Sequence, residues 1–434
     1  MPLPDYVRPF RNTNEQVDGT KNNKNKCMMK KYFLHLFRIL STLLIGVLAY
    51  FVYVIFWIGN FNAEQSKAVE NINADLRQSF PIIRDSNGCF GVVATVNGQY
   101  TDTLLLDTQA STSLAKQEVL DRYEAEYWKR KPMPTFNFYK QVYFSKLYKV
   151  NDITLGDCKL KGVVFTSVPK DNGMYNALYR PVLGRAIMEN IGWKFDMDSN
   201  KMVMFAPGNG QLLQRETEGF TLTKGGVNDL QLYSEQTDTL NVMFDLGSNY
   251  DIMIDRTVYE KMRQRQTPRI YANYRREGLT DTIAEFNDIT VFCNGKAIPD
   301  CTLSYIPSVD RNVAGNIFAG KINFILANGD LYVKQRTDGA PQVIRDGLAP
   351  LGLRLNVRSN VVCITALETN GPAEKAGLML GDKVIAVDKG AIESGMMSVS
   401  SGRLETYIQQ ADSLTLEIER NGQRQMFSIT GEPK

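Results

Sequence analysis

A long apolar stretch lies near the N-terminus of this 434-residue chain. Residues 39–59, from Ile39 to Gly59, contain no charged side chain. At about 1.5 Å per residue they are long enough to cross a hydrocarbon core of about 30 Å. Residues 1–38 are basic, which places them in the cytoplasm and the rest of the chain outside, in the periplasm if the cell is bacterial. The pattern predicts a single-pass membrane anchor over 39–59 and a tether over 60–87, and the alternative is a cleaved signal peptide.

Beyond this stretch the apolar positions form short runs rich in β-branched and aromatic residues. Turn signals such as Asn97-Gly98 and Gly156-Asp157 separate the runs. The best candidates for helix are 114–127 and 252–264, each placed after an apolar run. The pattern predicts mostly antiparallel β structure, with strands at 90–96, 103–106, 142–148, 152–155, 163–167, 229–233, 240–244, 288–293 and 302–306.

Two four-residue words occur twice in this β region. Thr-Asp-Thr-Leu stands at 101–104 and 237–240, and Asn-Asp-Ile-Thr at 151–154 and 287–290, both with an offset of 136 positions. Two words in the same order at the same offset indicate a duplication. We therefore expect two related domains, lobe one at 88–206 and lobe two at 207–340.

An aspartate follows an equivalent apolar run in each half. Leu104 to Leu106 lead into Asp107, and Asn241 to Phe244 lead into Asp245. If the lobes pack about a pseudo-twofold axis, these two carboxyl groups can meet. Two adjacent carboxyl groups cannot both ionise, so they share a proton and can act as base and acid on one water.

The rest of the composition restricts the chemistry in the same direction. The single histidine, His35, lies in the basic N-terminal region. The rest of the chain therefore lacks the histidine that catalytic triads and zinc hydrolases ordinarily use. The six cysteines have no metal-binding spacing, and we expect no metal and no cofactor. Cys293 and Cys301 flank a predicted hairpin and either pair or stay as separate thiols. Residues 1–38 carry a net +5, which leaves −2 for the remainder of a +3 chain and predicts no nucleic-acid binding.

These motifs resemble those of aspartic proteases of the pepsin and retropepsin type. The resemblance implies catalytic roles for Asp107 and Asp245. It also implies supporting roles for the turn residues that follow them, which are Thr108, Gln109, Gly247 and Ser248. A second family element, two apolar residues and a glycine before a short helix, is matched at 182–184 and at 318–320.

Each turn departs from the family pattern at one position. Gln109 replaces a glycine, and its side chain is expected to crowd a tight turn that often has positive φ. Leu246 replaces a threonine whose hydroxyl, in the family, bonds to the opposite lobe. The alternative hypothesis is therefore that the lobes are an inactive, peptide-binding scaffold.

The C-terminal part, 345–430, has a different pattern. Leu351-Gly352-Leu353, then Gly371-Pro372-Ala373, then Gly381-Asp382 resemble a PDZ domain, with a groove helix expected over 402–410. In such a domain the backbone amides of Leu351, Gly352 and Leu353 would hold a peptide's terminal carboxylate, while the peptide adds a strand to the sheet.

Together these features predict a mainly β protein, with two tandem retropepsin-like β-barrel lobes, an α+β PDZ domain and an N-terminal transmembrane helix. The predicted function is that of a membrane-anchored aspartic endopeptidase acting on proteins or peptides outside the membrane. Its PDZ domain would bind peptide C-termini.

Overall fold

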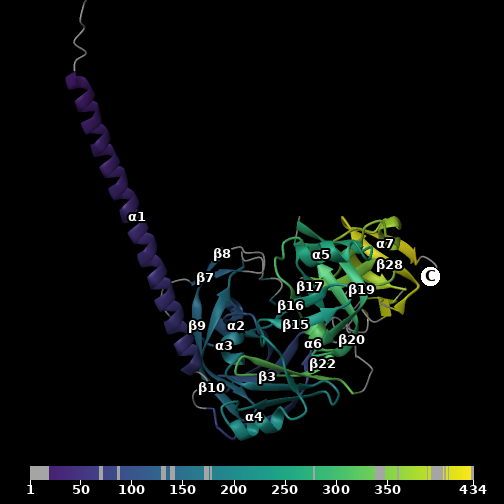
Figure 1. Cartoon of the computed structure of the whole chain (residues 1–434). Helices are drawn as coiled ribbons and strands as arrows, with labels where there is room; N and C mark the ends of the chain where they lie inside the picture. Colours follow the sequence, from purple (N-terminus) through teal and green to yellow (C-terminus); the bar gives the residue numbers. More distant parts are fainter. Residues whose placement is uncertain are drawn as a thin grey trace, which may run out of the picture. The chain divides into compact units, whose positions relative to one another are not determined.

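The N-terminal helix is a separate unit from the body of the chain. In the computed structural model, helix α1 (Gly19–Lys67) is continuous (Figure 1). Its segment Lys30–Phe56 is long and apolar enough to cross a membrane. Residues 1–63 and 64–434 form two compact units. The structure describes residues 19–67, 72–85, 88–128, 133–136, 142–170, 175, 178–276, 279–337, 348–358, 361–388, 390–391, 404, 407–408 and 410–431.

The segment predicted as a tether is partly structured. Helix α1 extends to Lys67, and β1 (Arg77–Pro81) pairs with β13 (Lys201–Phe205). Strand β2 (Ile83–Arg84) pairs with β3 (Phe90–Val96). The tether assignment over 60–87 is therefore wrong for residues 77–84. Strand β1 depends on a partner more than a hundred positions away, which no local pattern shows, and β2 has only two residues.

Lobe one is a sheet of eight strands in the order β2-β3-β4-β11-β5-β10-β9-β6. Strands β3 and β4 (Tyr100–Leu106) form a hairpin whose turn residues Asn97 and Gly98 both have positive φ, as a tight hairpin turn requires. The other strands of the sheet are β5 (Ser113–Lys116), β6 (Glu126–Tyr127), β9 (Leu147–Leu155), β10 (Cys158–Val168) and β11 (Val182–Leu183). A separate hairpin joins β7 (Met133–Phe136) and β8 (Val142–Ser145).

Lobe two repeats this pairing pattern. Its strands are β15 (Leu230–Ser234), β16 (Asp238–Phe244), β17 (Ile252–Ile254), β18 (Arg269–Arg276), β19 (Leu279–Cys293), β20 (Lys296–Tyr305) and β21 (Val313–Ala314). Val92 pairs with Leu104 in lobe one, and Leu230 pairs with Val242 in lobe two, an offset of 138 positions. The repeated words at an offset of 136 therefore stand two residues out of the structural register.

The two candidate helices are shorter than predicted. Helix α2 (Gln117–Arg122) follows β5, and α5 (Arg256–Met262) follows β17. Strands β5 and β17 pair in parallel with β10 and β20, so the first apolar residues of each candidate belong to a sheet. In each candidate the apolar residues of the strand run directly into those of the helix, so the sequence does not mark where the strand ends. The prediction therefore assigned the strand residues to the helix.

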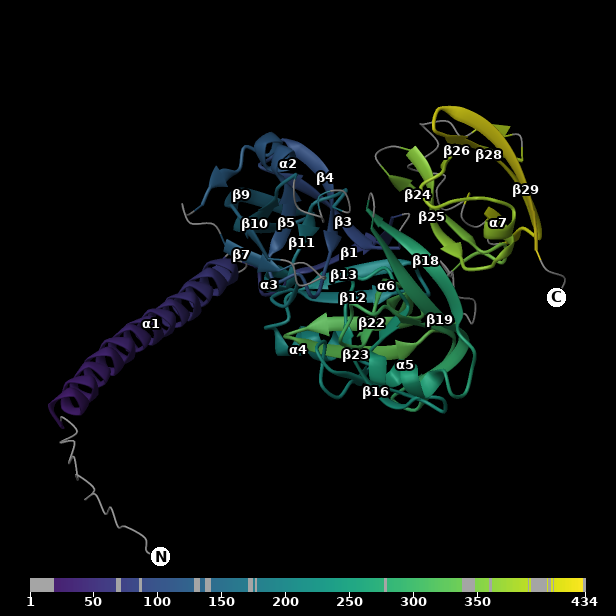
Figure 2. The ribbon, with the colours of Figure 1, turned by 90° about the horizontal axis from the view of Figure 1, so that it is seen from above.

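A six-stranded sheet, β1-β13-β12-β22-β23-β14, joins the two lobes. Its central strands β12 (Gly192–Asp196) and β22 (Ile322–Ala327) run antiparallel and side by side (Figure 2). Lys194 pairs with Ile325, 131 positions away, and the same offset separates β11 from β21. A strand that pairs with its own equivalent lies on a pseudo-twofold axis. The outer strands of lobe two are β23 (Asp330–Gln335) and β14 (Thr221–Leu222).

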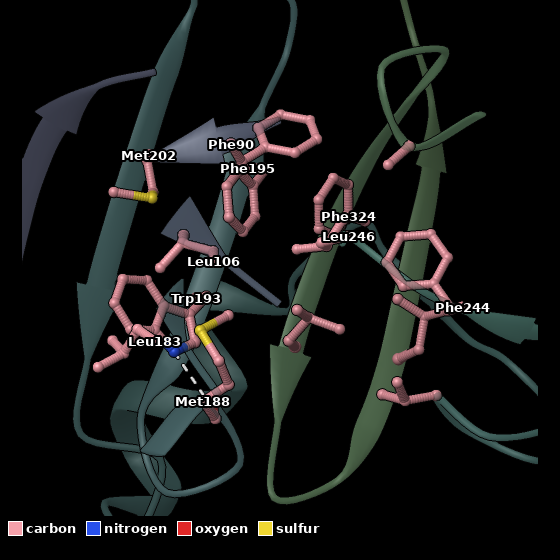
Figure 3. Close-up of a cluster of buried hydrophobic side chains, with 14 of the residues drawn as sticks. Phe90, Leu106, Leu183, Met188, Trp193, Phe195, Met202, Phe244, Leu246 and Phe324 are labelled. Carbon is pink, nitrogen blue, oxygen red and sulfur yellow. Dashed lines mark hydrogen bonds between the residues drawn. The ribbon is translucent and has the colours of Figure 1, made fainter. Parts of the chain in front are cut away.

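Aromatic side chains pack where the lobes meet (Figure 3). The rings of Phe195 and Phe324 are stacked with centroids 4.4 Å apart, and Phe90 lies edge-on to Phe195 at 5.1 Å. The ring of Phe244, at the end of β16, lies edge-on to that of Phe324, with the ring centroids 5.2 Å apart. These fully buried rings belong to one core that spans both lobes. Besides α2 and α5, the two lobes contain the short helices α3 (Arg185–Met188), α4 (Gly210–Glu216) and α6 (Asn316–Ala319).

The C-terminal module has its own core, which includes Leu351, Leu353 and Ile364. Its elements are β24 (Leu353–Arg358), β25 (Val361–Glu368), α7 (Pro372–Lys375), β26 (Lys383–Val387), β27 (Gly390–Ala391), β28 (Ser413–Arg420) and β29 (Gln423–Thr430). The hairpin β28–β29 turns at Asn421-Gly422, both with positive φ. Most of the groove helix predicted over 402–410 lies outside the described residues.

Strand pairing joins this module to lobe two. Strand β18 pairs with β25, so that Tyr271 lies opposite Glu368. The Arg269 guanidinium donates to both oxygens of the Glu368 carboxylate, at 2.6 Å each, and to the carbonyl oxygens of Leu348 and Ala349 at 3.0 and 2.8 Å. The amide of Thr369 also donates to the carbonyl oxygen of Ile270 at 3.0 Å. Arg269 therefore links lobe two to the start of the C-terminal module.

We expect Arg269→Met to loosen this junction while leaving both cores intact, because it removes four hydrogen bonds but keeps most of the side chain's volume. Hydrogen exchange of the Thr369 amide should become about tenfold to a hundredfold faster, as charge-assisted bonds contribute about 1.5–3 kcal/mol. Arg424→Met, an exposed change on β29, serves as the control. Unchanged protection of Thr369 in Arg269→Met would contradict the role given to this arginine.

Candidate active site

The two predicted aspartates occupy equivalent positions at the ends of β4 and β16. The backbone amide of Asp107 donates to the carbonyl oxygen of Leu183 at 3.1 Å, and that of Asp245 donates to Ala314 at 2.8 Å. Both acceptors end the short strands β11 and β21, which run parallel to β4 and β16. Each aspartate is therefore anchored by a neighbouring strand of its own lobe.

Glycines allow the chain to cross behind each aspartate turn. A Cβ atom at Gly184 would lie 2.4 Å from the carbonyl oxygen of Thr112, and one at Gly315 would lie 2.2 Å from that of Tyr250. Gly315, in Val313-Ala314-Gly315, is thus the equivalent of Gly184. The match proposed from sequence for lobe two, at 318–320, is wrong because the connection before it is shorter in lobe two, so that the equivalent glycine comes earlier.

The fold brings the two carboxyl groups together. The Asp107 and Asp245 side chains hydrogen bond to each other across the junction between the lobes. Both are partly exposed, which leaves them accessible at the surface of the junction. Burial raises the pKa of Asp107, and burial followed by the charge of Asp107 raises the pKa of Asp245 well above its ordinary value. These shifts favour a proton held between the two carboxyl groups.

Backbone hydrogen bonds distinguish the two carboxyl groups. Oδ1 of Asp107 accepts from the amides of Gln109 at 2.8 Å and Ala110 at 2.7 Å, whereas Oδ1 of Asp245 accepts from Gly247 at 2.9 Å. Donors aimed at a carboxylate stabilise its charged form. The negative charge is thus better stabilised on Asp107, and the shared proton is better placed on Asp245.

The turn residues of lobe one reach across to lobe two. The Thr108 hydroxyl donates to the carbonyl oxygen of Phe244 at 2.9 Å and accepts from the Leu246 amide at 3.1 Å. The Gln109 side-chain amide donates to the same Phe244 oxygen at 3.0 Å. Gln109 is absent from the residues with positive φ, so the expected strain at this position is not found.

The turn of lobe two has a different requirement. A Cβ atom at Gly247 would lie 2.2 Å from Oδ2 of Asp107, so glycine is needed there for close approach and not for positive φ. The Ser248 hydroxyl is buried, with no hydrogen-bond partner among the described residues. The Leu246 side chain is fully buried in the core that spans the lobes (Figure 3). Position 246 of lobe two therefore has no side-chain hydroxyl that could hydrogen bond to lobe one.

A polar cluster that sequence reasoning missed lies at the same junction. Asn316 Nδ2 donates to Asn249 Oδ1 at 3.1 Å, and Cys89 Sγ donates to the same oxygen at 3.0 Å. Burial, followed by the charge of Asp85, raises the pKa of the Cys89 thiol to about 12, so it is neutral and a poor nucleophile. In the sequence, Asn249 follows Ser248 and Asn316 follows Gly315. Asparagine after a small residue is common in loops, so this pattern did not mark the cluster.

The remaining cysteines stay apart. Cys293 and Cys301 are both free and buried, so of the two alternatives the structure has separate thiols. Burial raises the pKa of Cys293 to about 11. Among the described residues, no group of three or more His, Cys, Asp or Glu side chains could hold a metal ion.

The loop before β24 has a geometry that bears on peptide binding. Gly352 has a φ of 78°, its amide donates to the carbonyl oxygen of Ala349 at 2.9 Å, and its carbonyl oxygen accepts from Glu368 at 2.8 Å. A family model for the PDZ domain matches residues 349–430 of this chain. Residues 349–430 form a PDZ domain.

The PDZ groove strand is β24, which pairs with β25 alone among the described residues. Because Gly352 bonds across to Glu368, the alternation of an antiparallel pair directs the amide of Leu353 toward the other, open edge. Of the three amides predicted to hold a carboxylate, that of Gly352 is thus already used within the chain. The Leu353 carbonyl oxygen accepts from the amide of Ala349 at 3.1 Å.

Comparison with solved structures finds aspartic proteases. The chain is similar to an aspartic proteinase from Irpex lacteus, with a TM-score of 0.43 and 10% identity over 60% of this chain and 98% of that one. It is also similar to a retropepsin-like aspartic protease from Rickettsia conorii, with a TM-score of 0.23 and 16% identity over 31% and 94%. These scores are too low to support an argument about activity. No curated protein matches the sequence.

The raised pKa of Asp245 predicts a pH-dependent stability. The folded state binds more protons than the unfolded state between the ordinary pKa of about 4 and the raised one, so stability falls as pH rises through this window. Asp245→Asn should remove most of this slope. It should also raise stability at neutral pH by about 1.4 kcal/mol for each unit by which the pKa is raised.

Thermal unfolding between pH 4 and pH 8 measures this effect. Asp229→Asn, at an exposed turn position, is the matched control and should retain the wild-type slope. The same slope in wild type and Asp245→Asn would show that the two carboxyl groups do not share a proton.

Proposed function

We propose that this protein is a membrane-anchored aspartic endopeptidase that cleaves proteins or peptides outside the membrane. Asp107 and Asp245 are its catalytic residues, and Thr108, Gln109, Gly247 and Ser248 form the supporting turns. The observation that carries the proposal is a pair of hydrogen-bonded carboxyl groups, one from each lobe, with raised pKa values. Such a pair provides a base and an acid in one place without a metal ion or histidine.

The asymmetry of the pair assigns a role to each member. Asp107, as the carboxylate, takes a proton from a water molecule, whose oxygen bonds to the peptide carbonyl carbon. The electron pair of the carbonyl double bond moves to its oxygen, which takes the proton of Asp245. As the tetrahedral intermediate collapses, Asp107 gives its proton to the leaving nitrogen, and a hydroxyl of the intermediate returns a proton to Asp245. The dyad is then ready for another cycle.

The remaining parts of the chain supply location and substrate binding. In this proposal residues 39–59 anchor the protein, residues 1–38 are cytoplasmic, and lobe one (88–206), lobe two (207–340) and the PDZ domain (345–430) lie outside, on the periplasmic side in a bacterium. The PDZ domain binds peptide C-termini by adding a strand to β24. The partners are protein or peptide substrates, with no nucleic acid and no cofactor.

Hydrolysis by the full-length chain in detergent micelles tests the catalytic proposal. A peptide library read by mass spectrometry should show cleavage by wild type, and Asp107→Asn or Asp245→Asn should each lower the rate by about a hundredfold or more. Asp229→Asn should keep wild-type activity. The pH profile of kcat should be bell-shaped, since Asp107 must be ionised and Asp245 protonated.

Equal background cleavage by wild type and both asparagine variants across the pH series would refute the enzyme. The lobes would then be a scaffold that binds peptides without turnover.

Peptides with free and amidated C-termini test the PDZ proposal. A peptide with a free carboxylate should bind at least about tenfold more tightly than its amide, because the Leu353 amide and its neighbours donate to a charged group. Fluorescence anisotropy of labelled peptides on the full-length chain measures this ratio. Equal affinity for the two forms would exclude recognition of C-termini.

A further inference from the structure

Among the described residues, the side-chain hydrogen bonds to the backbone next to the opposite aspartate come from lobe one only. Thr108 and Gln109 both belong to the turn of lobe one, and both donate to the carbonyl oxygen of Phe244 in lobe two. By the offset of 138 positions, the equivalent of Thr108 is Leu246, which has no polar group to return such a bond. A symmetrical pair of lobes would make one hydroxyl bond in each direction, whereas here both bonds run the same way.

Chemistry determines which end of the Gln109 amide faces Phe244. A carbonyl oxygen only accepts hydrogen bonds, so it must meet the NH₂ group and not the oxygen of the glutamine side chain. The bond therefore needs a donor at this position, and an apolar side chain of the same size cannot replace it.

The backbone groups that bond to Thr108 and Gln109 lie on both sides of Asp245 in the sequence. The Phe244 carbonyl belongs to the peptide unit before Asp245, and the Leu246 amide, which donates to Thr108, belongs to the peptide unit after it. Fixing both peptide units fixes the Cα atom of Asp245 relative to lobe one, and thus relative to Asp107. A displacement of about 1 Å between reacting groups can cost about a hundredfold in rate.

The two turns are not interchangeable. Position 247 must be glycine, because a Cβ atom there would strike Asp107, whereas position 109 carries a long side chain without positive φ. The space in the junction is thus divided unequally. Lobe two gives room to the carboxyl of Asp107, and lobe one contributes the two side chains that bond to the Phe244 carbonyl oxygen.

We propose that Gln109 is a positioning residue that replaces the hydroxyl missing at Leu246, so that Thr108 and Gln109 together hold Asp245 against Asp107. This inference rests on the proposed function for its kinetic consequence, but its structural part does not depend on activity. It reverses the expectation that glutamine weakens the site.

Gln109→Met tests the role of the donor while keeping the size of the side chain. The melting temperature should fall by about 2–4 °C, as expected for one hydrogen bond in a chain of this kind. The higher of the two dyad pKa values, followed by ¹³C NMR of labelled aspartate carboxyl groups, should move toward the ordinary value. kcat should fall by about tenfold or more with KM changed less than twofold. Gln231→Met, at an exposed position on β15, is the control and should match wild type.

Rescue separates this role from simple packing. Adding Leu246→Thr to Gln109→Gly supplies a hydroxyl from lobe two, and the double variant should recover a substantial part of the dyad pKa lost in Gln109→Gly. The pKa is the readout, measured at a temperature where both variants are folded, because Leu246 is fully buried and its loss lowers the melting temperature by itself. A Gln109→Met variant with wild-type pKa values and melting temperature would overturn the proposal. So would a folded double variant whose dyad pKa is no closer to wild type than that of Gln109→Gly alone.

The two proposals fail in different ways. If wild type cleaves nothing but Gln109→Met still lowers the melting temperature and the dyad pKa, the enzyme is refuted and the positioning role stands. If wild type cleaves peptides and Gln109→Met leaves kcat, pKa values and melting temperature unchanged, the enzyme stands and the positioning role is refuted.

Discussion

Two carboxyl groups that share a proton set the strictest geometric requirement in this protein. Their energy depends on a contact between side chains from separate lobes, so a small shift of one lobe separates them and lowers the pKa of Asp245. Burial raises the pKa of both groups, and the charge of Asp107 raises that of Asp245 further, which means that the folded state bears a cost at neutral pH. The surrounding structure must offset this cost and hold the lobes in place.

Three layers of structure meet that requirement. Strands β11 and β21 bond to the backbone amides of the two aspartates. Beneath them, the central pairing of β12 with β22 and the stacked rings of Phe195 and Phe324 join the lobes on their pseudo-twofold axis. Nearest to the dyad, Thr108 and Gln109 hold the chain on both sides of Asp245. The asymmetry of this last layer matches the asymmetry of the carboxyl groups, since lobe one supplies both the better stabilised carboxylate and the side chains that hold its partner.

The PDZ domain is connected to this body through lobe two. The pairing of β18 with β25 extends the sheet of lobe two into the domain, and Arg269 bonds to the backbone just before Gly352. The Gly352 amide is used within the chain, while the Leu353 amide faces the open edge of β24. The domain is therefore attached beside the loop that we propose binds a peptide's C-terminus.

Local patterns in the sequence determined the mainly β composition, the hairpin turns at Asn97-Gly98 and Asn421-Gly422, the apolar helix, the PDZ domain and the position of each aspartate after a strand. These features depend on alternation, turn chemistry and composition, which are visible within a few residues. Tertiary structure decided the register of the two halves, which is 138 and not 136 near the dyad, and the choice of Gly315 over Gly320, because insertions between strands shift equivalent residues without changing local patterns. It also decided that Arg77 to Pro81 pair with Lys201 to Phe205, and that Gln109 bonds to Phe244 in the other lobe. Such contacts join residues more than a hundred positions apart, and their energies depend on distances that exist only in the folded chain.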